Sequence, residues 1–365
     1  MQADPVNEIS QIVAHYAIGE LVDCQRDQRG FVNTSYFIVT RLHGVNQKYF
    51  LRRYKTSIHE EEIRFEHSVI RHVVENGLDI VARVLPTRDG GTYIKVMTAS
   101  DETAVYYAIF DFLEGEDKYT WIDPRCTRQE IESSAQVLAR FHLAVAGWEP
   151  DGQRNEPKIL DLLPAIKENL RLCRAKDQGN RFDQYLRLNL ELITSHIDQC
   201  LITLQDMGAS EFIQMVNHCD FHPGNLKFQN GQVVGLFDFD WSKMEVRLFD
   251  VALAIFYFFV SWGKNEDGKL RLADAARFLG AYQSAQFSFS SGIPLSRIES
   301  QCLPALLAAA NLYVLNWTIV DYIQKVVDIA EYRMFLEHSL NFIHWLNDSH
   351  HRAALKRIIS KTLSD

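Results

Sequence analysis

The feature that most constrains the fold lies at residues 216–240, with the sequence VNHCDFHPGNLKFQNGQVVGLFDFD. Its Asn-Gly pair, between two short apolar runs, is the strongest short-range signal for a β-hairpin. Asp220 and Asn225 precede the first strand of this hairpin, and Asp238 follows the second. Because an antiparallel pair brings its second strand back to where the first began, we expect these three side chains to converge. Two carboxylates and an amide carbonyl form an oxygen-rich site that suits Mg²⁺.

Composition narrows the class of protein. The chain has 365 residues, of which 47% are hydrophobic and 23% charged, as in globular proteins with a large core. The net charge of -9 argues against nucleic acid as the main partner. Six cysteines are scattered without a C-x-x-C pair, a pattern typical of reduced thiols in the cytoplasm. The first residues carry Asp4 and Glu8 and no apolar core, so we expect no secretory signal.

We also expect no membrane association. The most apolar run that we identify, residues 251–262, has 12 residues, whereas a membrane-spanning helix needs about 20. We interpret this run as a buried core helix.

Residue patterning divides the chain into two lobes, 1–112 and 113–365. In the first lobe, alternating apolar residues and turn signals predict strands, and one stretch has helical spacing. In the second, helical patterns dominate, and the hairpin of 225–239 is the only material with strand character. The predicted strands are 33–40, 48–54, 79–87, 91–97 and 105–113. The predicted helices are 59–77, 128–147, 161–175, 181–207, 270–284 and the region 299–347.

The order H-x-D-x-x-x-x-N, followed by a hairpin and an aspartate, resembles the catalytic core of protein-kinase-like phosphotransferases. In detail, HCDFHPGN, GLFDFD and RLFDVA resemble the aminoglycoside phosphotransferase and choline kinase superfamily. Two further stretches, EIRFEHSVIRHVVENGLDIVARVLPTRDG and AIFDFLEGED, look most like homoserine kinases of many bacteria. The resemblance implies an α+β, two-lobed, protein-kinase-like fold. Its small lobe would be an antiparallel β-sheet with one helix, and its large lobe mainly helical.

The same resemblance implies roles for the residues of the second lobe. Asp220 would orient the attacking hydroxyl and accept its proton, and His218 would brace the catalytic loop. Asn225 and Asp238 would hold Mg²⁺ on the phosphates of ATP. Asp250 would tie down the loop from below.

In the first lobe, the segment 29–36 would cover the phosphates, with Gly30 allowing a tight turn and Asn33 and Thr34 offering donors. Arg52 would reach the phosphates and Glu66 would hold it. The connector 110–113, including Asp111 and Leu113, would present backbone groups to adenine. Two features depart from the usual pattern: Arg52 replaces the more common lysine, and the phosphate loop has a single glycine.

Several of these residues also have purely structural interpretations. Arg52 could be a solvated strand residue, and Glu66 competes with the adjacent Glu60–Glu62 on the same helix. His142, on an apolar helix stripe, is interpreted as a core histidine. An aromatic and acidic wall would suit an ammonium group, although each member could equally be packing. The candidate substrate residues are Asp240, Trp241, Trp317 and Asp321. Asp240 could also support a metal ligand or cap the following segment.

The predicted function is transfer of a phosphoryl group from ATP, with Mg²⁺, to a hydroxyl of a small molecule. The first expectation for the acceptor is homoserine or a related amino alcohol. Alternatives are choline, aminoglycoside or sugar kinases, or a protein Ser/Thr kinase of the same superfamily. A non-catalytic nucleotide-binding module is the alternative of another class. We expect a monomer or homodimer.

Overall fold

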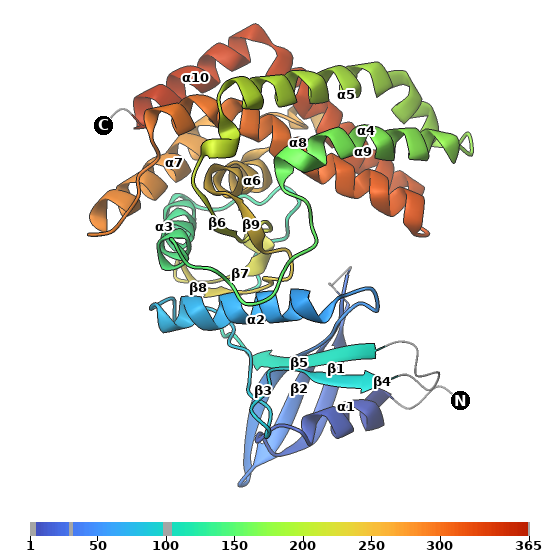
Figure 1. Ribbon diagram of the computed structural model, residues 1–365, viewed down its shortest axis with the longest axis vertical. Helices are drawn as coiled ribbons and strands as arrows, with labels where there is room; N and C mark the ends of the chain where they lie inside the picture. Colours follow the sequence, from blue (N-terminus) through green and yellow to red (C-terminus); the bar gives the residue numbers. More distant parts are fainter. Residues whose placement is uncertain (1–4, 29–31, 98–103, 364–365) are drawn as a thin grey trace. The chain divides into compact units, whose positions relative to one another are not determined.

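The structure is a computed structural model that describes residues 5–28, 32–97 and 104–363 (Figure 1). The chain divides into two compact units. The first comprises Met1–Gly115, Pro150–Arg154 and Gly235–Asp240, and the second comprises Glu116–Glu149, Asn155–Val234 and Trp241–Asp365. The mixed α+β class predicted from the sequence is confirmed.

The first unit is built on a five-stranded antiparallel sheet with the strand order β1-β2-β3-β5-β4. The turn between the second and third strands has positive φ at both His43 (51°) and Gly44 (81°), as in the two-residue hairpin turns that match strand twist. The strands are β1 (Glu20–Asp27), β2 (Thr34–Leu42), β3 (Val45–Arg53), β4 (Ile94–Met97) and β5 (Ala104–Asp111).

One face of this sheet is covered by helix α1 (Pro5–Val13), which the sequence analysis did not predict. Its apolar residues recur at helical spacing and pack with inward-facing residues of β2, β3 and β5 in one buried cluster. The members of the cluster from α1 and these strands are Ile9, Ile12, Val13, Ile38, Leu51, Val105, Tyr107 and Ile109.

The first unit also contains helix α2 (Glu60–Glu75). Three glutamates occupy its first turn, where they stabilise the positive end of the helix dipole. The carboxylate of Glu62 accepts a hydrogen bond from the amide of His59 at 3.1 Å, which caps the helix. Because successive strand residues point to opposite faces, Leu51 joins the α1 cluster while Arg52 points to the face where α2 presents Glu66.

The strand predicted at 79–87 is wrong. This segment makes single bridges, Val81 with Leu236 and Val84 with Phe110, instead of a ladder. The carbonyl of Arg83 accepts the amide of Asp111 at 2.9 Å, so the segment ties down the end of β5.

The second unit contains two small sheets among helices. Strands β7 (Leu226–Gln229) and β8 (Gln232–Leu236) form the predicted hairpin. Its turn residues Asn230 and Gly231 have φ values of 52° and 77°, the conformation that the Asn-Gly pair indicates. Strands β6 (Gln214–Asn217) and β9 (Lys243–Val246) pair antiparallel in a second sheet. The expectation that this half holds one strand pair was therefore wrong.

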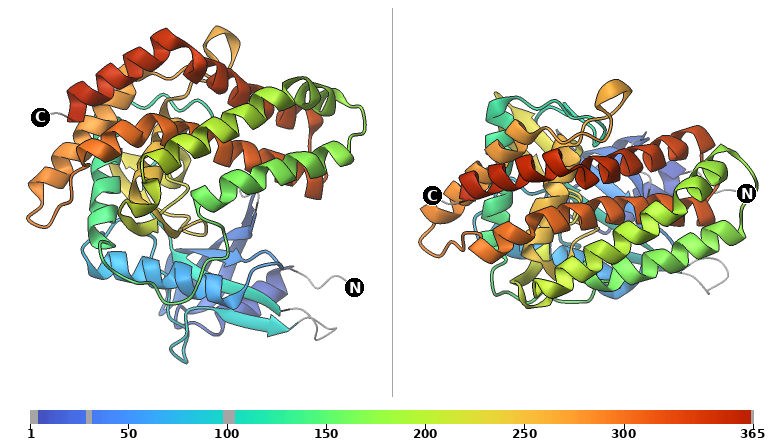
Figure 2. Two further views of the ribbon diagram at one scale, coloured as in Figure 1. Left: turned by 45° about the horizontal axis from the view of Figure 1, so that its top comes forward. Right: turned by 90° about the horizontal axis from the view of Figure 1, so that it is seen from above.

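The helices of the second unit surround a central one, α8, which packs against α4, α5, α6 and α9 (Figure 2). The region predicted as helical at 299–347 is divided between α8 and α9. The helices are α3 (Arg128–Ala144), α4 (Ile159–Ala175), α5 (Arg181–Asp206), α6 (Arg247–Phe259), α7 (Leu272–Ser288), α8 (Arg297–Gln324), α9 (Ile329–Asn347) and α10 (Ser349–Leu363). Short 3₁₀ helices are η1 (Ala209–Glu211), η2 (Pro223–Asn225) and η3 (Lys264–Glu266).

Helix α8, with 28 residues, is longer than the run singled out from the sequence. Among the described residues, it is the one helix whose length and composition would allow it to cross a membrane, with a mean hydropathy of 1.5 in its best window. Yet 78% of that window is buried inside the protein, as in the core helix of a folded domain. The prediction of a buried core helix at 251–262 corresponds to α6, whose side chains are nearly all buried.

Candidate functional site

The first unit contains a buried guanidinium that two carboxylates share. Nη1 of Arg52 donates to Oε1 of Glu66 at 2.8 Å, and Nη2 donates to Oδ1 of Asp238 at 2.6 Å. Burial by itself lowers the pKa of Arg52, but the charges of Asp238 and Glu66 outweigh it, so the group stays charged. The planar fork of arginine can engage both acceptors at once. Of the glutamates on α2, Glu66 is therefore the one that contacts Arg52.

A chain of hydrogen bonds holds Glu66 from behind. The hydroxyl of Tyr54 donates to Oε2 of Glu66 at 2.8 Å and lies 3.0 Å from Nε2 of His67. Nδ1 of His67 lies 2.8 Å from the hydroxyl of Thr92. Burial, followed by the charge of Arg52, lowers the pKa of His67 to about 3, so the ring is neutral. With Tyr54 donating to Glu66, Nε2 of His67 carries the proton and Nδ1 accepts from Thr92.

Asn33 and Asp240 contact each other in the same unit. Nδ2 of Asn33 donates to Oδ2 of Asp240 at 2.7 Å, and Oδ1 of Asn33 accepts the amide of Lys55 at 3.0 Å. The other oxygen of Asp240, Oδ1, is buried and has no hydrogen-bond partner among the described residues. Thr34, predicted beside Asn33, begins β2, whereas Gly30 lies outside the described residues.

The connector at the end of β5 offers free backbone groups. The amide of Asp111 is taken by the carbonyl of Arg83 at 2.9 Å. In the part of the chain that the structure describes, the amide and carbonyl of Leu113 have no hydrogen-bond partner. A connector with an uncommitted donor and acceptor can pair with the edge of a planar base, as the prediction for Leu113 requires.

In the second unit, donors from three directions surround Asp220. Nδ2 of Asn225 donates both to the backbone carbonyl of Asp220 (2.9 Å) and to its Oδ2 (2.8 Å). Nε2 of His222 lies 3.5 Å from the same oxygen, and the hydroxyl of Tyr257 on α6 forms a further hydrogen bond with the carboxylate. Nδ1 of His222 accepts the amide of Gly224 at 3.0 Å, so its proton resides on Nε2, facing Asp220.

A buried aspartate fixes the backbone of this loop. Oδ2 and Oδ1 of Asp250 accept the amides of His218 and Cys219 at 2.8 and 2.9 Å. Nε2 of His142 lies 3.1 Å from Oδ2. Burial raises the pKa of Asp250, but the bond from His142 and the amide of His218 outweigh it and lower the pKa. The clamp holds Cys219 at a φ of 60°, a conformation that costs a residue with a Cβ about 1 kcal/mol.

The buried rings around this clamp are structural. The imidazole of His218 is completely buried and packs near Phe141 and Phe221. His142 bridges Asp250 to the hydroxyl of Tyr282, which lies 2.7 Å from its Nδ1. His142 is thus a core histidine with both ring nitrogens in polar contacts, as interpreted from its sequence.

With this geometry in view, the chain can be compared with known proteins. Residues 23–287 match the model of the phosphotransferase enzyme family, APH. The chain belongs to this family. The phosphotransferase is 24% identical to homoserine kinase of Brucella ovis over 316 residues, which cover 87% of this chain and 84% of that protein.

Solved structures share the fold at lower identity. A microcompartment-associated aminopropanol kinase superposes with a TM-score of 0.70 at 15% identity, covering 97% of this chain and 99% of the other. Choline kinase from Cryptosporidium parvum Iowa II superposes with a TM-score of 0.57 at 13% identity, covering 99% and 98%. These matches confirm the kinase-like fold and a kinase-type phosphotransferase that acts on small molecules.

The oxygen atoms predicted to hold Mg²⁺ suit a hard cation. Because Nδ2 of Asn225 is committed to Asp220, its Oδ1 is left without a hydrogen-bond partner among the described residues. The side chain of Asp238 is 35% exposed, and Oδ1 of Asp240 is unpartnered. No cluster of three or more His, Cys, Asp or Glu side chains that could hold a metal occurs in the described part of the chain. Mg²⁺ needs fewer, since it keeps waters and phosphate oxygens.

Two of the predicted substrate residues belong to an aromatic cluster of the second unit. Trp317 lies 6.0 Å from Tyr332 and 6.2 Å from Phe335, measured between ring centres. Asp321, one turn after Trp317 on α8, accepts the hydroxyl of Tyr332 at 2.9 Å and pairs with Lys325 at 2.8 Å. Both oxygens of Asp321 therefore have partners within the protein. Trp241 is half-buried at the start of the second unit's last segment.

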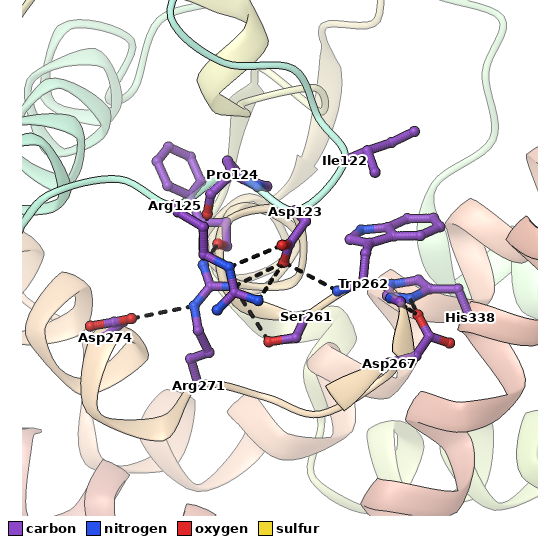
Figure 3. A network of polar contacts seen from close by, with 12 residues as sticks. Ile122, Asp123, Pro124, Arg125, Ser261, Trp262, Asp267, Arg271, Asp274 and His338 are labelled. Carbon is purple, nitrogen blue, oxygen red and sulfur yellow. Dashed lines mark hydrogen bonds and ion pairs between the residues drawn. The ribbon is translucent and has the colours of Figure 1, made fainter. Parts of the chain in front are cut away.

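The cluster continues into a polar network (Figure 3). Trp262 stacks on His338 with ring centres 3.5 Å apart, and Nδ1 of His338 lies 2.9 Å from Asp267. Asp123 accepts the backbone amide of Trp262 at 3.2 Å and pairs with Arg271 at 3.6 Å. These contacts fix the segment after α6 and give the cluster a structural role.

Sequence reasoning missed three groups that contact predicted site residues. These are Tyr257 and His222 beside Asp220, and the Tyr54–His67–Thr92 chain behind Glu66. A signal for His222 existed, since it lies within the loop motif itself. Tyr257 lies 37 positions beyond Asp220, inside an apolar helix, where nothing in the sequence distinguishes it from a core residue.

Proposed function

We propose that the phosphotransferase transfers the γ-phosphoryl group of ATP, accompanied by Mg²⁺, to a hydroxyl of homoserine or a related amino alcohol. The single observation that supports this best is the carboxylate of Asp220, which is 20% exposed and held by Asn225, His222 and the hydroxyl of Tyr257. The printed names of the relatives, homoserine kinase and aminopropanol kinase, favour acceptors that carry both a hydroxyl and an amino group.

In this proposal, Asp220 orients the acceptor hydroxyl and takes its proton as the phosphoryl group transfers. Such a transition state is loose and depends mostly on positioning and charge, so an ordinary carboxylate suffices. The hydrogen bonds from Asn225 and Tyr257 fix the orientation of the carboxylate before the acceptor binds. His218 and Asp250 shape the loop from beneath without touching substrate.

Arg52 would contact the phosphates of the nucleotide, with Glu66 setting the direction of its guanidinium. Asn33 and Thr34 would lie near the phosphates, and Leu113 would pair with adenine. Mg²⁺, held through the oxygens of Asn225 and Asp238, would neutralise phosphate charge. The predicted cytoplasmic location and the monomeric or dimeric state remain predictions.

The test is ADP release from Mg-ATP in the presence of homoserine, ethanolamine, choline, aminoglycosides or hexosamines, with Asp220→Ala alongside. We expect turnover with an amino alcohol or homoserine, and a loss of about 10²–10⁴-fold in kcat for the variant, the usual contribution of a general base. Glu149→Ala, an exposed carboxylate of the same unit, is the control and should behave as the wild type. Turnover that survives unchanged in Asp220→Ala would contradict the assignment.

A further inference from the structure

The segment Pro150–Arg154, here called the strap, lies across helix α2 (Figure 1). It belongs to the first unit, although the chain on both sides of it belongs to the second. The amide of Gln153 donates to the carbonyl of Glu61 at 3.2 Å. The amide of Asp151 donates to the hydroxyl of Ser68 at 3.0 Å, and the same hydroxyl donates to the carbonyl of Asp151 at 3.2 Å. The main chain of the strap therefore binds α2 at both ends of two helical turns.

Two side chains of the strap add ion pairs to these contacts. Oδ1 of Asp151 lies 2.6 Å from Nη2 of Arg64, and both side chains are exposed. Arg154 lies 3.6 Å from the carboxylate of Glu62, with exposed fractions of 6% and 9% for the two side chains. An exposed pair contributes little, whereas breaking a buried pair is costly, so the pair of Arg154 and Glu62 is the more important of the two.

Gly152 lies between these contacts and approaches the main chain of the helix. Its φ of 89° is in the region that favours glycine. A Cβ on this residue would meet the carbonyl oxygen of Glu61 and would lie 2.7 Å from the amide nitrogen of Phe65. Both neighbours are backbone atoms of α2. The strap can therefore lie this close to the helix only because residue 152 has no side chain.

The strap contacts one stripe of α2, and Glu66 lies on the stripe beside it. Glu66 follows Phe65 by one residue, and its Oε1 accepts Nη1 of Arg52 at 2.8 Å. Because the helix moves as one element, a rotation or slide of the contacted stripe also displaces Glu66. A displacement of about 1 Å would lengthen this bond to about 3.8 Å, beyond hydrogen-bonding range. The contacted stripe has helical spacing and consists of Glu61, Arg64, Phe65 and Ser68.

We propose that the strap, through Gly152 and Ser68, sets the position of α2 at which Glu66 binds Arg52, and thereby sets the affinity for ATP. This inference rests on the proposed function, in which Arg52 contacts the phosphates. Gly152 and Ser68 are positioning residues, because they act through Glu66 and touch neither the nucleotide nor the acceptor.

The first test is Gly152→Ala in the full-length protein. Calorimetry gives the affinity for Mg-AMP-PNP, and kinetics give KM for ATP and for the acceptor. We expect the nucleotide affinity to fall about 10-fold, the value of one charged hydrogen bond, while KM for the acceptor stays unchanged. Gly90→Ala is the matched control, because Gly90 lies in the same unit, has a φ of 88°, and a Cβ there meets nothing within 4 Å. It adds the same backbone strain without the collision and should bind the nucleotide as the wild type does.

Ser68→Ala tests the strap without adding an atom. It removes the hydroxyl that binds the main chain of Asp151, so we expect the nucleotide affinity to fall about 3- to 10-fold. Ser134→Ala is its control, because the hydroxyl of this buried serine donates to a carbonyl of its own helix, α3. The nucleotide affinity of the control should equal that of the wild type.

A double-mutant cycle with Glu66→Ala separates positioning from general stability. Once the contact between Glu66 and Arg52 is lost, neither Gly152→Ala nor Ser68→Ala should weaken nucleotide binding further. Unchanged affinity in the folded single variants, or losses that add in full to that of Glu66→Ala, overturns the inference and leaves the proposed function standing. If Gly152→Ala does not fold, Ser68→Ala and its cycle decide the inference.

If the wild type binds no nucleotide, the proposed function fails, and the same cycle is measured by amide hydrogen exchange of β3. The inference is supported if exchange is faster in Ser68→Ala than in the wild type, but no faster in the double variant than in Glu66→Ala. Unchanged exchange in Ser68→Ala, or effects of the two substitutions that add, overturns it.

Discussion

Replacing Arg52 with lysine tests whether one guanidinium serves two carboxylates. Nη1 and Nη2 of Arg52 bind Glu66 and Asp238 separately, at 2.8 and 2.6 Å. A lysine ammonium is a compact point charge and cannot occupy both positions. We expect it to keep the buried Glu66, which is 2% exposed, and to lose Asp238, which is 35% exposed.

The magnitude follows from the burial of the two partners. A hydrogen bond to a charged group contributes about 1.5–3 kcal/mol, and the partial exposure of Asp238 places this one near the lower end. A loss of about 1.5 kcal/mol increases local opening roughly tenfold. In Arg52→Met both bonds are lost and Glu66 is left buried without a counter-charge, which costs about 3–5 kcal/mol.

Hydrogen exchange is the appropriate assay, because all six tryptophans lie in the second unit and fluorescence would not report on the first. Amides of β3 and α2 should exchange about ten times faster in Arg52→Lys than in the wild type. Arg41→Lys makes the same change at an exposed arginine of β2 and is the matched control. Equal amide exchange rates in Arg52→Lys and Arg41→Lys would refute the conclusion that the guanidinium of Arg52 stabilises the first unit by binding both carboxylates.

Three further predictions concern the second unit. His196 on α5 is buried, and neither of its ring nitrogens has a hydrogen-bond partner among the described residues. Burial lowers its pKa to about 4, so the ring stays neutral in the folded protein at a pH where the ring of the unfolded chain is protonated. Stability should therefore fall as pH decreases through about 6.5, by on the order of 2 kcal/mol between pH 7 and pH 5. His196→Leu should remove that contribution in urea unfolding followed by tryptophan fluorescence, and an unchanged pH dependence would contradict it. In Gly224→Ala, the added Cβ would lie 2.8 Å from Cε1 of His222 and would displace that ring from Asp220. We expect kcat to fall about 10- to 100-fold while KM for ATP stays unchanged. A wild-type kcat in this variant would show that the ring of His222 is dispensable. In Asp250→Asn, one carboxylate oxygen that accepts a backbone amide is replaced by an NH₂ group, which faces that amide as a second donor. The free energy of unfolding in urea should fall by about 3 kcal/mol. A value within about 0.5 kcal/mol of the wild type, the usual range of surface substitutions, would contradict the role of Asp250 in holding the loop.

Local signals in the sequence correctly predicted a turn, a helix and a strand. The Asn-Gly turn, the helical spacing of 59–77 and the alternation of 33–40 each correspond to an observed element. Strand β1 lacked such a signal because most of its residues are exposed or half-buried, so it has no apolar alternation. The run 79–87 has strand-type residues, but its backbone groups bind Leu236, Ile109 and Asp111 at isolated bridges and form no ladder.

Contacts between distant segments explain the rest of the site. The motif spacing indicated that Asn225 and Asp220 adjoin, and they share two hydrogen bonds. Arg52 and Asp238 are 186 positions apart, and no periodicity within either segment encodes their contact.

The route of the chain between its two units has a consequence for biosynthesis. The chain passes from one unit to the other five times, after Gly115, Glu149, Arg154, Val234 and Asp240. Asp238 therefore becomes available to the first unit only after the ribosome has added almost 190 residues beyond β3. At ordinary rates of synthesis this takes about 10–40 s. During that interval Arg52 can pair with Glu66 but not with Asp238. A fragment that ends at Gly115 would be frozen at this stage, so we expect the first unit to mature late in translation although most of it is synthesised first.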